Sequence, residues 1–184
     1  MKKLNLFIAL SIGFLIFSCS SDDDSSNQNN NNQSGFNYDG TFYPTTDLYL
    51  NYTDSGPTNS SISLIMISED LLSNCEVSDV NYVLIEFATS SPDILLAQET
   101  YTNSEYDFFD YVVFENGIFN SDCDLTASDM ILNDSMNDLM ASPITLTINS
   151  INDNSINLNF SLTRDDGSII IGSYSGNYTD VSDI

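Results

Sequence analysis

The sequence predicts an all-β domain, and three observations support this fold class. The 184-residue chain is 41% hydrophobic and 11% aromatic, which is enough for one domain with an apolar core. From Phe36 onward, apolar and polar residues alternate mostly with a period of two, as in antiparallel strands that have one buried and one wet face. Turn signals rich in Asn, Asp and Gly separate these alternating runs.

The first part of the predicted domain contains five candidate strands. They are Thr41–Tyr43, Leu48–Tyr52, Ile62–Ile67, Val80–Ala88 and Phe108–Glu115. The last two are apolar on both faces in parts, which predicts central positions in a sheet or packing of one sheet on another. Asp39-Gly40 and Asn116-Gly117 are the two strongest hairpin signals, because these dipeptides favour tight two-residue turns.

The last part of the chain predicts a three-stranded meander. Ser155–Thr163 alternates most regularly, and Ile144–Ile148 precedes it across a turn at 152–154. A turn at 164–167 leads to a third strand, 168–178. On one face of that strand, glycines alternate with tall aromatic residues: Gly172, Tyr174, Gly176 and Tyr178.

One stretch departs from the two-residue period. Leu132, Met136, Leu139 and Met140 have the spacing of one helical face, which predicts a short helix or ordered loop around residues 128–140. The rest, about eight short strands with regular turns, fits an antiparallel β-sandwich or an up-and-down β-barrel, with a lipocalin-like barrel as one form of the latter.

The first 18 residues have the features of a secretory signal peptide. Lys2 and Lys3 form a basic start, and the apolar run Leu4–Phe17 is too short to span a bilayer core comfortably. The run ends at Ile16–Cys19, which resembles the lipobox of bacterial lipoproteins. This resemblance implies that the chain is cleaved before Cys19 and that the lipid on this cysteine anchors the protein to a membrane.

An acidic run follows directly behind the predicted lipidated cysteine. Ser21 with Asp22, Asp23 and Asp24 resembles the surface-export signal of Bacteroidota lipoproteins, which implies display on the outer face of the outer membrane. The same residues also suit a plain polar linker. Residues 20–35 are mostly Ser, Asp, Asn and Gln, so we expect 19–35 to be a lipidated cysteine with a disordered tether, and 36–184 to be the all-β domain.

Acidic residues outnumber basic residues 27 to 3, and two of the basic residues lie in the signal peptide. We therefore expect no binding of nucleic acid, which needs clustered Lys and Arg. The acidity suits solubility in a salty medium, where counter-ions screen self-repulsion, or the binding of divalent cations. The chain has no His, which argues against His-dependent catalytic triads and His-ligated zinc.

With Cys19 acylated, two cysteines remain. Cys75 and Cys123 both have polar, turn-like surroundings, and an exported protein meets an oxidising compartment. They are candidates for a disulfide, with two unpaired thiols as the alternative. We expect no catalytic cysteine, since no His or cluster of cations is present to activate the thiol.

Two aspartate clusters are weak candidates for calcium ligands, the one cofactor considered. Asp122 and Asp124, with Asp129 nearby, form the first cluster, and Asp165 with Asp166 forms the second. Neither matches a twelve-residue EF-hand loop, and solvated turns are the simpler interpretation.

A three-residue pattern marks one candidate modification site. Asp134-Ser135-Met136 resembles the signal for O-glycosylation in Bacteroidota, in which an Asp precedes the hydroxyl residue and an apolar residue follows it. Ser135 is therefore a candidate glycan acceptor.

Two classes of function remain. The first is a non-catalytic surface binding or adhesion module whose partner is a glycan or a protein, since exposed aromatic side chains suit stacking on sugars. The second is a hydrolase that cleaves extracellular glycans with a pair of carboxylates. No such pair stands out, so we expect no enzyme. A lipocalin-like barrel would add a third class, the binding of a small ligand inside the barrel.

The ends of the predicted body carry turn and strand patterns. They comprise Asp39–Tyr43 at the start, and Asp166-Gly167 with Gly172–Gly176 at the end. These patterns resemble a recurrent group of uncharacterised Bacteroidota surface lipoproteins of flavobacterial type. The resemblance spans nearly the whole body and implies a β-rich surface domain, but no chemistry.

Overall fold

The computed structural model describes residues 33–54, 60–89, 95–136 and 139–182, which form two six-stranded sheets and no α-helix. Sheet A has the order β2-β1-β11-β10-β9-β6, formed by β1 (Gly35–Tyr38), β2 (Thr41–Pro44), β6 (Thr100–Thr102), β9 (Ala141–Ile151), β10 (Ser155–Arg164) and β11 (Ile169–Asn177). Sheet B has the order β12-β3-β4-β5-β7-β8, formed by β3 (Asp47–Asp54), β4 (Ser60–Ile67), β5 (Val77–Thr89), β7 (Asp107–Phe119), β8 (Leu125–Asn133) and β12 (Thr179–Asp180).

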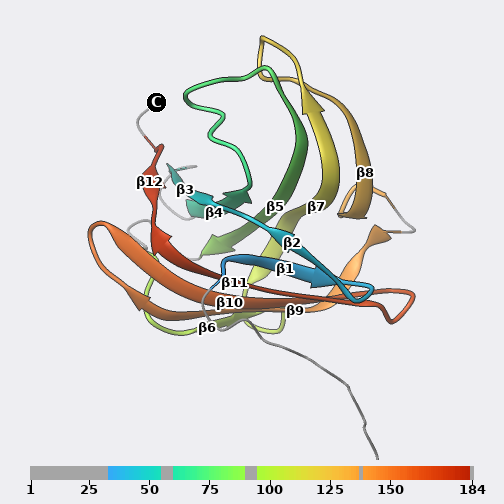
Figure 1. The fold of residues 1–184 in the computed structure, drawn as a ribbon. Helices are drawn as coiled ribbons and strands as arrows, with labels where there is room; N and C mark the ends of the chain where they lie inside the picture. Colours follow the sequence, from blue (N-terminus) through green and yellow to red (C-terminus); the bar gives the residue numbers. More distant parts are fainter. Residues whose placement is uncertain (1–32, 55–59, 90–94, 137–138, 183–184) are drawn as a thin grey trace, which may run out of the picture. The chain divides into compact units, whose positions relative to one another are not determined.

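The two sheets are the layers of a β-sandwich (Figure 1). Both sheets are open, with an edge strand on each side, so the all-β prediction is confirmed in its sandwich form and no closed barrel is present among the described strands. Paired strands run antiparallel, except that β12 runs parallel to β3. The predicted meander is observed as β9-β10-β11.

The main apolar core joins the inner faces of the two sheets. From β10 of sheet A it takes Ile156, Leu158, Phe160 and Leu162, and from β5 of sheet B it takes Val83, Ile85 and Phe87. These are the alternate positions that the two-residue period assigned to one face. Burial of each large apolar side chain contributes about 1.5–3 kcal/mol, so this core holds the sandwich together.

A second apolar cluster explains why β5 and β7 are apolar on both faces. It consists of five buried residues of sheet B: Tyr49, Ile67, Val80, Phe114 and Phe119. Leu71 from the loop after β4 and Val181 from the C-terminal segment pack against it. The central positions predicted for the two strands are confirmed, since β5 and β7 lie between β4 and β8.

For the described residues of 128–140, the helical alternative is wrong, because β8 continues to Asn133 and a turn follows it at 134–136. Leu132 is fully buried and pairs with Val113 of β7. Met136, assigned to the same helical face, is 47% exposed. Strand pairing therefore prevails over the helical spacing of a few apolar residues, in a segment whose Asn, Asp and Ser residues favour helices poorly.

The predicted hairpin turn at Asn116-Gly117 is also wrong, whereas Asp39-Gly40 does form the β1–β2 turn. Asn116 has a φ of 53°, but it lies inside β7, where the pairing with β5 and with β8 shifts register. The dipeptide thus provides the left-handed backbone for an irregularity within a strand rather than for a turn.

The first strand begins at Gly35, one residue before the predicted start of the domain at Phe36. Ser34 is already part of the fold, since its carbonyl oxygen accepts from the Thr45 N–H at 3.0 Å and its hydroxyl accepts from the Ser175 N–H at 3.0 Å. The sequence pattern did not indicate β1, β6, β8 or β12. Of these, β6 has three residues and β12 has two, which is too short to show a period.

Gly172→Ala is expected to destabilise the fold. A Cβ at position 172 would lie 2.2 Å from Cζ of Phe160 on the paired strand β10 and 2.8 Å from the carbonyl oxygen of Gly35. Such overpacking costs about 1–3 kcal/mol. Gly176→Ala is the matched control on the same strand, since the closest atom there is the Tyr174 hydroxyl at 3.2 Å. Urea denaturation should show the larger loss for Gly172→Ala, and equal losses would contradict this packing.

Candidate functional site

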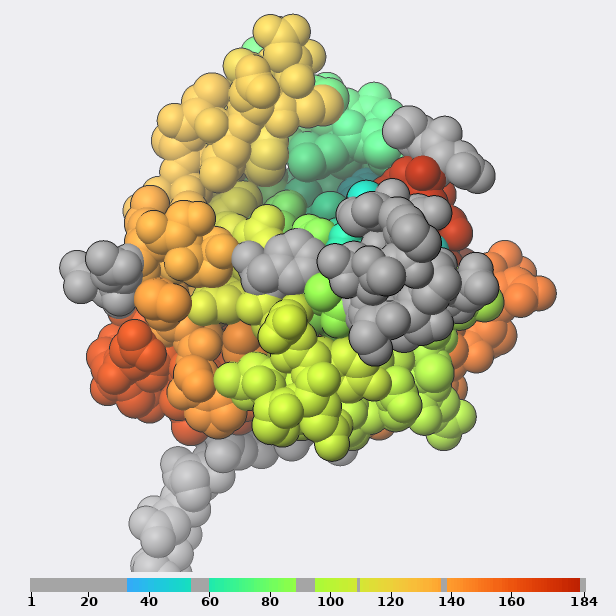
Figure 2. Space-filling view, turned by 180° about the vertical axis from the view of Figure 1, so that it is seen from behind, coloured from blue at the N-terminus to red at the C-terminus, as the bar shows by residue number. Residues whose placement is uncertain are grey.

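A disulfide joins two loops at one end of sheet B. Cys75 and Cys123 are bonded with their Cα atoms 4.7 Å apart. Cys75 lies in the segment between β4 and β5, and Cys123 lies in the turn between β7 and β8. In Figure 2 the golden-yellow β7–β8 hairpin projects at the top of the molecule, and the green segment before β5 lies next to it. The disulfide therefore fixes a projecting hairpin to its neighbouring loop.

Asp70 holds the same loop independently of the disulfide. Its carboxylate accepts hydrogen bonds from the Tyr49 hydroxyl at 2.8 Å, from the Leu72 N–H at 3.1 Å and from the Ser73 hydroxyl. The hydrogen bonds from Ser73 and Tyr49 lower the pKa of Asp70. Because Tyr49 belongs to β3, this carboxylate ties the loop to the outer face of sheet B.

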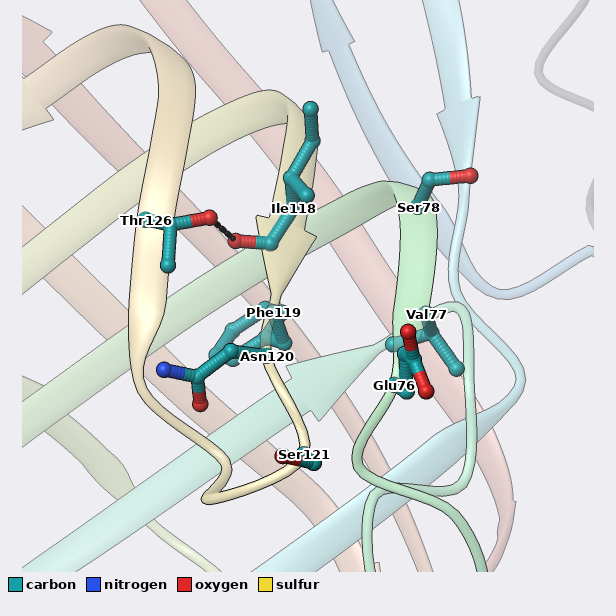
Figure 3. A pocket seen from close by; sticks show the side chains of 8 residues that line it. All are labelled: Glu76, Val77, Ser78, Ile118, Phe119, Asn120, Ser121 and Thr126. Carbon is teal, nitrogen blue, oxygen red and sulfur yellow. Dashed lines mark hydrogen bonds between the residues drawn. The ribbon is translucent and has the colours of Figure 1, made fainter.

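A shallow pocket of about 480 Å³ lies beside the hairpin (Figure 3). It is lined by Glu76, which precedes β5, by Val77 and Ser78 at the start of β5, and by five residues of the hairpin: Ile118, Phe119, Asn120, Ser121 and Thr126. The Thr126 hydroxyl donates to the Ile118 carbonyl at 2.9 Å, so it is already engaged. Glu76 is the one charged residue among the eight. A single carboxylate in an open pocket supplies neither an acid–base pair nor a set of metal ligands.

Three carboxylates lie together on the outer face of sheet B. Glu86 of β5 pairs across the strands with Asp110 of β7, and Asp134 follows β8. Partial burial, followed by the charges of Asp134 and Glu86, raises the pKa of the Asp110 carboxyl. Among the described residues, this is the closest counterpart to the carboxylate pair that the hydrolase hypothesis needs.

The aspartates proposed as calcium ligands lie in two separate hairpins. Asp122 and Asp124 are in the β7–β8 turn, and Asp165 and Asp166 are in the β10–β11 turn. Asp129 accepts a hydrogen bond from Asn116 at 2.8 Å. Within the ranges that the structure describes, no three His, Cys, Asp or Glu side chains form a group able to hold a metal ion.

Arg164 has a structural role at the end of β10. Its guanidinium donates to the Tyr38 hydroxyl at 2.7 Å and forms a salt bridge with Asp166 at 3.0 Å. Hydrogen bonds from Ser168, with a further contribution from Arg164, lower the pKa of Asp166. The cation thus links β1 to the β10–β11 turn and is not presented to a ligand.

The outward face of sheet A carries no carboxylate, and Arg164, the one cation in its strands, lies at the end of β10 with its side chain only 13% exposed. None of the six strands of this sheet contains Asp or Glu. The strands of sheet B, by contrast, contain Asp47, Asp54, Asp79, Glu86, Asp107, Asp110, Glu115, Asp129 and Asp180. Among the described residues, the carboxylates therefore lie in sheet B and in the segments between strands.

The outward residues of sheet A form rows that cross the strands. One row follows the strand order as Phe42, Asn37, Ile171, Ser161, Thr145 and Thr102. The next row is Ser173, Asn159, Thr147 and Thr100. We call these two rows the neutral face. Its amides and hydroxyls can donate and accept hydrogen bonds without bringing a charge.

Sequence analysis missed the neutral face. The alternation of Asn and Ser in β10 was visible, but it indicated only one wet face of a strand. The face is assembled by pairing β10 with β11, β11 with β1, and β9 with β6, and the last two pairs join segments far apart in the chain. A usable signal was present in the sequence, namely the lack of Asp and Glu from 141 to 151 and from 155 to 164.

The remaining candidates from the sequence are placed as follows. Ser135 is exposed in the turn after β8, and its hydroxyl donates to Asp134 at 3.2 Å. Cys19, Ser21 and Asp22–Asp24 lie outside the described residues. Among the residues that the structure does describe, no helix is long and apolar enough to cross a membrane.

Comparisons of the chain with models of protein families, with curated proteins and with solved structures found no match.

Replacing both Cys75 and Cys123 with Ser is expected to destabilise the domain. The disulfide closes a loop with a sequence separation of 48 residues. In the chain-entropy model a loop of this size contributes on the order of 4 kcal/mol. Urea denaturation of the oxidised protein, the reduced protein and the double variant would measure this. The reduced protein should match the variant, and equal stability of all three would show that the bond contributes nothing.

Asp110→Asn is expected to stabilise the domain at neutral pH. Because folding raises the pKa of this carboxyl, its ionised form is unfavourable in the folded state, and stability is lost as pH rises through the folded pKa. The neutral amide removes this cost. Below the unfolded pKa of about 3.9, Asp110 is protonated in both states and the gain should vanish.

Asp122→Asn is the matched control, because it removes the same charge from an exposed turn. Thermal denaturation at pH 7 and pH 3 would compare the two variants. A gain at pH 7 for Asp122→Asn as large as for Asp110→Asn would assign the effect to net charge and not to the environment of Asp110.

Proposed function

We propose that this chain is a lipoprotein anchored through Cys19, and that it displays its β-sandwich on the cell surface as a non-catalytic binding module. The targeting part of the proposal rests on the lipobox-like residues Ile16–Cys19 and on the acidic run Asp22–Asp24. The acidic body, with Arg164 as the one cation after the signal peptide, suits an aqueous, salty exterior.

The neutral face is the observation that supports a binding role. A carboxylate-rich protein gains solubility from charge on every surface, yet the outward side of sheet A carries none. Exposed apolar residues lie on the same side, since Ile169 is 51% exposed and Ile171 is 54% exposed. A surface that combines neutral polar groups with exposed apolar groups suits recognition of a partner more than it suits solubility.

Cys19→Ala is expected to abolish membrane association. In cells fed labelled palmitate, the unaltered chain should take up label and sediment with membranes, whereas the variant should do neither. Retention of label by Cys19→Ala would contradict the anchor.

Replacement of Asp22, Asp23 and Asp24 with Asn tests surface display. Protease added to intact cells should digest the domain of the unaltered chain and spare that of the triple variant. Protection of both chains would show that the acidic run is only a linker, and would place the domain on the inner side of the membrane.

A carboxylate-based hydrolase is the second candidate, and one observation favours it. Partial burial and the neighbouring charges of Asp134 and Glu86 raise the pKa of the Asp110 carboxyl, as a catalytic acid requires. Incubation of the protein with polysaccharides, followed by measurement of released reducing ends, decides between the two functions. If the unaltered protein releases reducing ends and Asp110→Asn does not, the protein is an enzyme and not a non-catalytic binding module.

A further inference from the structure

The longer row of the neutral face crosses the whole of sheet A. It begins with the partly buried ring of Phe42 on the edge strand β2 and ends at Thr102 on the opposite edge strand β6. Strands lie about 4.8 Å apart, so a row across six strands is about 24 Å long. This length suits an extended chain molecule more than a single small ligand.

The ring of Phe42 lies close against the backbone of sheet A. Gly35 makes this possible, because a Cβ at that position would lie 2.7 Å from Cζ of Phe42. A ring at the edge of a neutral polar row offers an apolar platform. The C–H faces of sugar rings stack on such platforms.

The centre of the neutral face has unused hydrogen-bonding groups. Asn37, Asn159, Ser161 and Ser173 make no side-chain hydrogen bond to any part of the chain that the structure describes. Around them, neighbouring side chains are already paired. The Asn149 amide donates to Asn157 at 2.7 Å, the Asn157 amide donates to Ser175 at 3.2 Å, and the hydroxyls of Thr100 and Thr147 lie 3.1 Å apart.

The negative charge of the domain limits which chemical class of partner can bind to the neutral face. A polyanion would be repelled by 27 carboxylates against three basic residues, at a face that supplies no cation. A protein partner is less favoured, since the Trp, Tyr and Arg side chains that dominate protein interfaces do not occur in the two rows. A neutral polysaccharide has hydroxyls for the amides and hydroxyls, and C–H surfaces for Phe42 and Ile171.

We propose that the neutral face of sheet A binds a neutral polysaccharide laid across its strands. Asn159 and Ser161 hold the chain by hydrogen bonds at the centre, and Phe42 stacks on a sugar ring at the edge. This inference rests on the proposed function, because it names the class of partner that the binding module recognises.

Binding of the full chain, in detergent, to immobilised dextran, mannan and xylan tests the proposal, with alginate as the anionic comparator. The chain should be retained by at least one neutral polysaccharide and not by alginate. Loss of two hydrogen-bonding groups in Asn159→Ala, Ser161→Ala should weaken retention by roughly tenfold or more. Ser121→Ala is the matched control, since it removes an exposed hydroxyl from the pocket at the disulfide end. Both variants should keep the thermal stability of the unaltered chain.

The outcomes separate this inference from the proposed function. If the double variant is retained on a neutral polysaccharide as strongly as the unaltered chain, or if Ser121→Ala weakens retention instead, the neutral face is not the binding site. The proposed binding module would still stand. Retention by alginate and by none of the neutral polysaccharides would contradict the proposal that the partner is neutral. Self-association that the double variant abolishes, without retention on any polysaccharide, would show that the face binds a second copy. Shortening of the polysaccharides during binding would overturn the proposed function itself.

Discussion

The large excess of carboxylates limits which residues can form the interior of this protein. With 27 acidic residues and almost no cations to pair with them, the fold must keep charge out of the seam between the sheets. The inner faces do this with alternating apolar residues, such as Phe160 of β10 and Phe87 of β5. Among the described residues, the acidic side chains lie in sheet B and between the strands, and the strands of sheet A contain none.

The end of sheet B that carries the disulfide is held by local contacts rather than by the main core. Beyond the second apolar cluster, the β7–β8 hairpin is mostly exposed, with Ile118 at 45% and Leu125 at 39%. The Cys75–Cys123 disulfide and the Tyr49–Asp70 hydrogen bond hold the adjoining loop to the sheet. This end is therefore stabilised by a covalent bond and polar contacts, and it differs physically from the neutral face, which lies on fully packed strands.

Much of the fold follows from local pattern. The period of two located the longer strands except β8, and the apolar character of β5 on both faces indicated its central position. The prediction failed where a local signal had two structural uses. Asn116 adopts the left-handed backbone that its turn signal indicates, but it does so inside strand β7. Leu132 has the spacing of a helical face, but it lies in β8 and pairs with Val113 of β7. The candidate site was not predictable because β1 and β6 complete it from distant parts of the chain, and register across strands is set by tertiary packing.

The proposed binding of a neutral sugar chain to the outward side of sheet A can be tested at single residues. Side-chain amide signals in ¹⁵N spectra of the protein report on it directly, because Asn37 and Asn159 lie on the neutral face and Asn120 lies in the pocket beside the β7–β8 hairpin. On addition of a neutral polysaccharide that binds the protein, the signals of Asn37 and Asn159 should shift, whereas that of Asn120 should not. Shifts confined to Asn120 would contradict the account.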